Sequence, residues 1–156
     1  MTLLEYHDLF FKSLKSKIDT NELGEFFFWI IEHTLGINRI NYMLNPQYLI
    51  NINKIPSLIN SINQLKNDMP IQYVVGQTEF MGMKYFLNLE VLIPRPETEE
   101  LVSWVLVSNP KNQKILDIGT GSGCIAISLA KFLKSCEITG WDLNNKILNV
   151  ARKNAE

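Results

Sequence analysis

Apolar residues in the first third of the chain recur at steps of three and four, which is the spacing of one face of an α-helix. A first helix is predicted from residue 3 to about residue 18, with an apolar stripe of Leu3, Tyr6, Phe10, Leu14 and Ile18. Thr2 and Glu5 have the spacing of a capping box at its start. We therefore expect an amphipathic helix that packs against a neighbouring helix.

Three further helices are predicted before the pattern changes. Asp19 and Glu22 mark the start of the second, and Gly36 supplies its stop. A short helix is expected over Arg39–Leu44, and a fourth over about residues 57–67. Together the four predict a compact helical domain over residues 1–76.

Short β-type runs replace the helical pattern after residue 76. Residues 78–81, 84–87 and 91–93 are predicted strands, with Gly82 in the turn between the first two. Residues 77–93 are therefore interpreted as a β-hairpin connector.

Residues 94–156 have the order of elements that is typical of an α/β domain. After a helix that starts near residue 97, the apolar run Lys114–Ile118 is followed by three alternating glycines and then by apolar residues at helical spacing. A second strand, Glu137–Trp141, leads to Asp142. This order predicts a strand, a tight turn, a helix and a second strand. The predicted fold class is α/β: an N-terminal helical bundle, a β-hairpin connector and the first part of a Rossmann-like sheet.

Composition narrows the class of protein. At 156 residues and 46% hydrophobic, the chain is long and apolar enough to bury a core. Its formal charge of −1 argues against a dedicated nucleic-acid-binding surface. The longest apolar run covers residues 26–31, far short of the roughly 20 residues of a membrane span.

The glycine loop is the strongest candidate for a binding site. Gly119, Gly121 and Gly123 allow positive φ and leave room beside the turn, while the start of the following helix offers free N–H groups to an anionic ligand. Asp142 lies 19 residues after Gly123, at the end of the neighbouring strand. A carboxylate there is placed to accept hydrogen bonds from a ribose diol.

The spacing of the loop discriminates between cofactors. A dinucleotide fingerprint requires Gly or Ala at position 124, where this chain has Cys124. Asp117 instead stands two residues before a Gly-x-Gly-x-Gly loop, which resembles the first motif of Rossmann-like methyltransferases that bind S-adenosylmethionine. The ammonium and carboxylate of that cofactor suit an acid beside free N–H groups. A plain glycine-rich turn and a nucleotide-dependent oxidoreductase remain as alternatives.

Arg95 is a second candidate. Pro94 and Pro96 fix the backbone on either side of it, and a helix rich in glutamate begins directly afterwards. The guanidinium is thus held where it could pair with an acid or with a substrate carbonyl. His7 and His33 have no partner at metal-ligand spacing, so no metal site is predicted.

Five segments together resemble the protein-(glutamine-N5) methyltransferases that modify peptide-chain release factors, the HemK/PrmC family. They are residues 73–76, 79–82, 91–99, 116–123 and 151–155, in the order and near the spacing seen in that family. The segment Ile-Pro-Arg-Pro-Glu-Thr at residues 93–98 is the most specific of them. The resemblance extends over nearly the whole chain, including the helical domain.

The resemblance implies a cytoplasmic enzyme that methylates the side-chain amide nitrogen of the glutamine in the Gly-Gly-Gln loop of a release factor. It implies S-adenosylmethionine as cofactor, a release factor docked on the helical domain, and no direct nucleic-acid or membrane partner. The implied cofactor contacts are Asp117, Gly119, Thr120, Gly121, Ser122, Gly123 and Asp142. The implied pocket wall consists of Arg95, Pro96 and Thr98.

One departure from the family is large. The sequence stops at Glu156, before the Asn-Pro-Pro-Tyr segment that holds the substrate amide in this family. We therefore expect a truncated sheet, no catalytic residue within this chain and no activity from the chain alone. The unpaired sheet edge, with Ile115, Leu116 and Ile118 exposed, would favour pairing with another copy. A non-catalytic module that docks a release factor or another protein is the alternative function.

Overall fold

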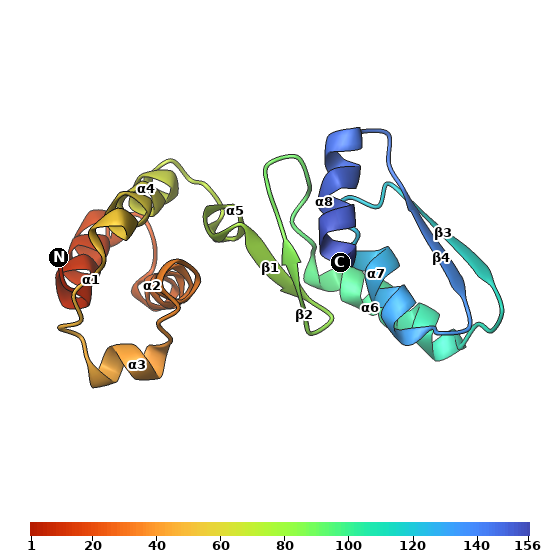
Figure 1. Cartoon of the computed structure of the whole chain (residues 1–156), viewed down its shortest axis with the longest axis horizontal. Helices are drawn as coiled ribbons and strands as arrows, with labels where there is room; N and C mark the ends of the chain where they lie inside the picture. Colours follow the sequence, from red (N-terminus) through yellow and green to blue (C-terminus); the bar gives the residue numbers. More distant parts are fainter. The chain divides into compact units, whose positions relative to one another are not determined.

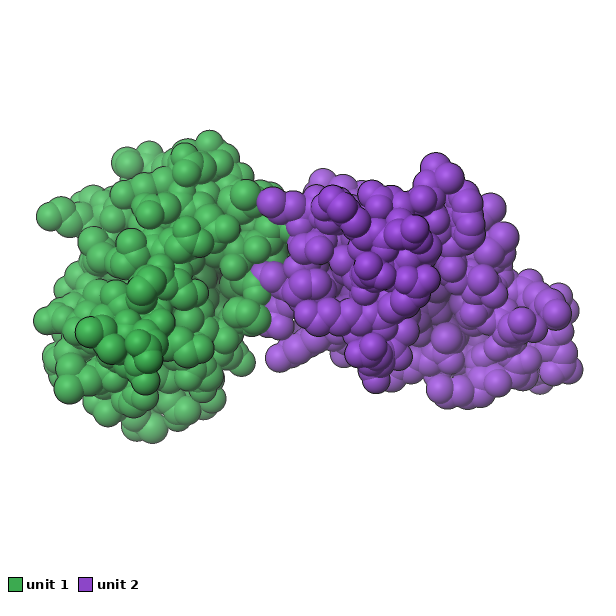
Figure 2. Space-filling view, turned by 45° about the horizontal axis from the view of Figure 1, so that its top comes forward, with its two compact units in different colours: residues 1–75 green, residues 76–156 purple.

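The computed structural model describes residues 1–156, and these divide into two compact units, residues 1–75 and 76–156 (Figure 2). Figure 1 shows the order of the helices and strands along the chain. The first unit is helical, while the second combines helices with two small sheets. None of the helices has both the length and the apolar character that crossing a membrane requires.

The first unit contains five α-helices and one short 3-10 helix. They are α1 (Leu3–Leu14), α2 (Thr20–Leu35), α3 (Arg39–Leu44), η1 (Ile52–Lys54), α4 (Ile55–Lys66) and α5 (Ile71–Val75). The predicted capping box is present, because the Thr2 hydroxyl accepts from the Glu5 N–H and the Glu5 carboxylate accepts from the Thr2 N–H. Helix α1 is shorter than predicted: it ends at Leu14, and Ile18 lies in the turn before α2, where it still packs against the core.

Aromatic rings form the centre of the first core. Tyr6, Phe10 and Phe27 are fully buried, and the ring centroids of Tyr6 and Phe27 lie 5.9 Å apart. The Tyr6 hydroxyl donates to the carbonyl oxygen of Leu58 at 3.2 Å and lies 3.1 Å from the Ser61 hydroxyl. These bonds satisfy a buried phenol, which would otherwise be costly to bury.

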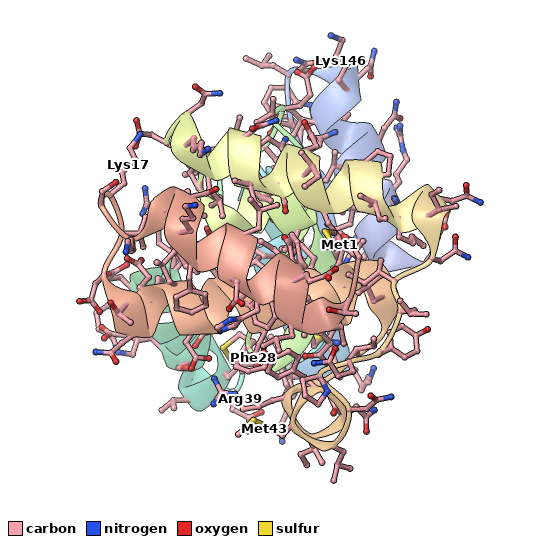
Figure 3. The ribbon with its side chains drawn as sticks, turned by 90° about the vertical axis from the view of Figure 1, so that its left-hand side faces the viewer. Met1, Lys17, Phe28, Arg39, Met43 and Lys146 are labelled. Atoms are coloured by element: carbon pink, nitrogen blue, oxygen red, sulfur yellow. The ribbon has the colours of Figure 1, made fainter.

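An arginine joins α3 to α2 on the surface of this unit. The Arg39 guanidinium lies 4.4 Å from the centroid of the Phe28 ring and pairs with the Glu25 carboxylate at 2.6 Å. Figure 3 shows Phe28, Arg39 and Met43 close together on this side of the molecule. The cation–π contact and the ion pair hold the short α3 against the longer helix.

The second unit contains four strands and three helices. They are β1 (Gln77–Phe80), β2 (Met83–Phe86), α6 (Pro96–Ser108), β3 (Lys114–Ile118), α7 (Cys124–Phe132), β4 (Glu137–Trp141) and α8 (Asn145–Ala155). Strands β1 and β2 pair antiparallel, whereas β3 and β4 pair in parallel with Lys114 opposite Glu137. Helix α7 connects the two parallel strands and packs against both (Figure 1). This is the strand–helix–strand unit that the sequence predicts.

The β1–β2 hairpin is part of the second core. Phe80 and Tyr85 are buried in it, and the Tyr85 hydroxyl lies 3.0 Å from the Ser128 hydroxyl on α7. At the hairpin turn, the Met81 N–H donates to the Glu99 carboxylate on α6 at 2.6 Å. The hairpin is therefore fixed to α6 and α7 by both apolar and polar contacts.

The predicted third strand over residues 91–93 is wrong. The Val91 N–H donates to the carbonyl oxygen of Asn88, and the Asn88 side chain accepts from the Glu90 N–H. These bonds close a turn, and Pro94 then lacks the N–H that a strand would need.

The two-stranded parallel sheet has one open face. Leu116 is 58% exposed and Ile118 is 70% exposed, as expected from the sequence. Ile115 differs from the expectation, because it is partly buried against the core around α7. The difference follows from the alternation of side chains along a strand, which turns Ile115 towards the helix and turns Leu116 and Ile118 away from it.

Candidate functional site

The glycine loop between β3 and α7 is tied to the end of β4. The N–H groups of Gly119 and Thr120 both donate to the carbonyl oxygen of Trp141, at 2.8 and 2.9 Å. Gly119, Gly121 and Gly123 have φ of +78°, +57° and +82°. All three lie in the left-handed region, which glycine adopts without steric cost.

The Thr120 side chain lies between the loop and the two strands. Its hydroxyl donates to the Asp117 carboxylate at 2.7 Å. A Cβ at Gly140 would lie 2.8 Å from the Thr120 Oγ1, so only glycine fits opposite Thr120 on β4. Gly140 is thus a site residue that the sequence reasoning missed, although a glycine inside a strand is a known signal of close backbone approach.

The Asp142 carboxylate reaches back from the end of β4 to the loop. Its Oδ2 accepts from the Gly121 N–H at 3.2 Å, and its Oδ1 accepts from the Asn144 N–H at 3.3 Å. Asn144 also caps α8 by accepting from the Lys146 N–H. The carboxylate is half-buried, and each of its oxygens keeps a lone pair for a further hydrogen bond.

The start of α7 is buried behind the loop. The Ser122 side chain is only 2% exposed, and its hydroxyl has no hydrogen-bond partner. Burial raises the pKa of the Cys124 thiol, the first residue of α7. Both cysteines are free, so neither takes part in a disulfide.

The predicted wall residues lie at the start of α6. Arg95 precedes the first turn and is exposed, and Pro96 begins the helix. The Thr98 N–H donates to the Arg95 carbonyl at 3.0 Å. No hydrogen bond joins these three residues to the glycine loop, whereas the Asp117 and Asp142 carboxylates each accept a hydrogen bond from it.

Asn154 is a second residue that the sequence reasoning did not single out. From α8, its side-chain oxygen accepts from the Phe86 N–H at 2.7 Å. Its side-chain N–H groups donate to the carbonyl oxygens of Phe86 at 3.0 Å and Ser122 at 2.8 Å. The only signal in the sequence was its position within the motif at residues 151–155.

An apolar cavity of about 330 Å³ lies behind the loop, between α7, β4 and α8. Its walls include Gly123, Ile127, Ile138, Leu148 and Ala151. The N–H groups of Gly119, Thr120, Gly121 and Gly123 already have acceptors within the protein. The Asp142 carboxylate is therefore the polar group that the loop region offers to a ligand, and it makes the loop the better candidate site.

Two parts of the chain match described protein families. Residues 10–76 match the PrmC N-terminal domain, and residues 109–156 match a methyltransferase domain. The first match covers most of the helical unit, and the second covers the strand–helix–strand unit that carries the glycine loop together with α8.

Curated relatives that share one name, release factor glutamine methyltransferase, occur in several bacteria. A release factor glutamine methyltransferase of Flavobacterium psychrophilum is 42% identical over 160 residues, which cover 99% of this chain and 56% of the relative. That of Bacteroides thetaiotaomicron is 43% identical, covering 78% of this chain and 44% of the relative. That of Streptococcus pneumoniae is 48% identical, covering 60% and 34%. The chain spans about half the length of the curated relatives it matches.

Proposed function

Because this chain belongs to the family of release factor glutamine methyltransferases (HemK/PrmC), we propose that the whole protein transfers a methyl group from S-adenosylmethionine to a release factor. The acceptor is the side-chain amide nitrogen of the glutamine in the Gly-Gly-Gln loop. The reaction takes place in the cytoplasm, where release factors act. The observation that carries the proposal is the Asp142 carboxylate bonded to the Gly121 N–H of the glycine loop.

The residues of the loop fit this cofactor. A Cβ built on Gly119 meets no atom within 4 Å, and one built on Gly121 meets only the Gly119 carbonyl at 3.9 Å. The space beside the loop is therefore open to a ligand, and the positive φ values account for the glycines. Asp142 is proposed to accept from the ribose hydroxyls through its remaining lone pairs. Asp117 and residues 119–123 are proposed to bind the rest of the cofactor, with Arg95, Pro96 and Thr98 as the pocket wall.

This methyl transfer depends more on the positioning of the two reacting groups than on acid–base catalysis. The bound cofactor supplies an electrophilic methyl group, while an amide nitrogen is a weak nucleophile. The rate then depends on holding the two groups together in the right geometry. The residues of this chain are proposed to supply the cofactor side of that arrangement, and no residue of 1–156 is assigned to hold the glutamine amide.

We assign protein docking to the helical domain of residues 1–76, followed by the hairpin at 77–93 and the methyltransferase domain from 94. Six large hydrophobic side chains on α3 and in the segment that follows it are exposed in the helical unit: Ile40, Met43, Leu44, Tyr48, Leu49 and Ile52. Exposed apolar side chains that gather on one part of a domain are typical of a protein-binding surface. The same observation favours the second candidate function, a docking module without catalysis of its own.

Calorimetry on the full-length protein tests the class of cofactor. We expect S-adenosylhomocysteine to bind more tightly than NAD, because the loop lacks the dinucleotide spacing at Cys124. Tighter binding of NAD would contradict the proposal and favour an oxidoreductase.

A transfer assay tests the reaction. Radiolabelled S-adenosylmethionine and an unmodified release factor are incubated with the full-length protein, beside a release factor whose Gly-Gly-Gln glutamine is replaced. Label is expected only on the unreplaced release factor. Binding of the release factor without any transfer of label would favour the docking module instead.

A further inference from the structure

The Asn154 carboxamide joins two segments that are far apart in the sequence. One is the backbone of Phe86, at the end of β2, and the other is the carbonyl of Ser122 in the glycine loop. Both side-chain N–H groups are used as donors, and the oxygen is used as an acceptor. A carboxamide is the only short side chain that can donate twice and accept once in this way.

Other contacts between α8 and this part of the chain support the same arrangement. The Lys153 ammonium lies 3.4 Å from the centroid of the Phe86 ring. The Lys146 ammonium pairs with the Glu90 carboxylate at 3.2 Å. These two contacts are at the surface, where cation–π contacts and ion pairs are both weak, so they contribute less than the half-buried carboxamide.

The strand that Asn154 holds leads towards the proposed pocket wall. After Phe86, the buried Leu87 donates from its N–H to the Gly76 carbonyl at 2.8 Å. The chain then turns at residues 88–91 and reaches Arg95 at the start of α6. Asn154 therefore connects the glycine loop directly with the segment that precedes the wall.

We infer that Asn154 is a positioning residue for the cofactor, which holds the Ser122 carbonyl and the end of β2 in one arrangement. The inference rests on the proposed function, since it assigns Asn154 a role in the same site. Asn154 need not touch the ligand. Its loss frees the loop carbonyl and the hairpin to move independently, so the glycine loop and the wall are no longer held around one ligand.

Thermodynamic linkage between cofactor binding and the Asn154 contacts has a second consequence, which can be measured independently. If opening of the Asn154 contacts weakens cofactor binding by some factor, then cofactor binding must suppress that opening by the same factor. Opening releases the Phe86 N–H, which can then exchange with water. Saturating cofactor should therefore slow hydrogen exchange at Phe86 in the unaltered protein.

The experiment uses the full-length protein and S-adenosylhomocysteine as the probe. Asn154→Asp keeps the acceptor for the Phe86 N–H but removes both donors. Asn149→Asp, at an exposed position on the same helix, is the control with the same change of charge. We expect Asn154→Asp to weaken binding by about tenfold or more, within the range usual for coupled sites, while the control binds like the unaltered protein. Exchange at Phe86 should slow by a similar factor when the unaltered protein is saturated.

Two results would overturn the inference. One is equal affinity of the two variants for S-adenosylhomocysteine, and the other is exchange at Phe86 that does not respond to saturating ligand. The exchange measurement needs no variant, so it decides the question even if Asn154→Asp does not fold. Failure of the unaltered protein to bind the probe would instead refute the proposed cofactor. In that case, exchange at Phe86 in the ligand-free variants still tests whether Asn154 holds the hairpin.

Discussion

Gly140 on β4 and Thr120 in the glycine loop pack so closely that no Cβ fits between them. A Cβ at position 140 would lie 2.8 Å from the Thr120 Oγ1 and 3.2 Å from the Thr120 Cβ. Both atoms belong to the short side chain of Thr120, whose hydroxyl is held by the Asp117 carboxylate. The strand and the loop therefore fix each other's position through the absence of one side chain.

Gly140→Ala should destabilise the second unit by about 1–3 kcal/mol, the usual cost of overpacking. The added methyl group must push Thr120 away from Asp117, so cofactor affinity should fall as well. Urea unfolding and calorimetry measure the two effects. Gly24→Ala is a suitable control, because a Cβ at Gly24 in α2 meets no atom within 4 Å. That variant should gain up to about 1 kcal/mol from helix propensity.

Asp142→Ala should weaken S-adenosylhomocysteine binding to the full-length protein by roughly 1.5–3 kcal/mol, the value of a hydrogen bond to a charged group. Asp142→Asn keeps an oxygen acceptor without the charge, so its loss should be smaller. Calorimetry gives both numbers. An unchanged affinity in Asp142→Ala would mean that this carboxylate serves only the backbone N–H groups of Gly121 and Asn144.

Phe27→Ala should cost about 3–5 kcal/mol, because the ring is fully buried among Tyr6 and Phe10. Residues 1–76 produced alone should be helical and unfold cooperatively, and this substitution should unfold them. Trp29→Ala is the matched control on the same helix, since that ring is 41% exposed. A disordered far-UV spectrum of unaltered residues 1–76 would show that the helical unit depends on the rest of the protein.

Cys124 should react slowly with iodoacetamide at pH 8. Burial raises the pKa of its thiol, so the reactive thiolate is scarce until the pH exceeds the ordinary range for cysteine, near 8.5. Cys136 is half-buried and should be labelled first. Peptide mapping after timed labelling separates the two sites. Faster labelling of Cys124 than of Cys136 would contradict the burial of the α7 start.

Elements with strong local signals could be predicted from the sequence. Helix α3 has the predicted bounds, as do β3 and β4, because a cap, a glycine or a change of period marks each end. Helix α5 was missed, since it has only five residues and follows directly after Pro70. Residues 91–93 are predicted as a strand because they are apolar and lie next to a turn, but they do not form one.

The residues of the candidate site also differ in how well the sequence predicts them. The glycine loop and Asp142 could be found from spacing, and the structure bonds them to each other. The roles of Gly140 and Asn154 could not be found from spacing, because they depend on which residue lies opposite each of them in space. Nothing in the local sequence tells that Asn154 faces β2 and the loop at once.

The contact between Asn154 and Phe86 also bears on the order in which the protein is made. The two residues are 68 positions apart, so the hairpin leaves the ribosome well before its partner on α8. The helical unit, by contrast, has its core partners within residues 1–75 and can complete itself early. During synthesis, Phe80 and Tyr85 remain uncovered until α6 and α7 arrive, and the end of β2 remains unpaired until α8 does. A nascent chain halted between these points should therefore combine a folded N-terminal unit with an exposed hairpin, which is a natural target for chaperones.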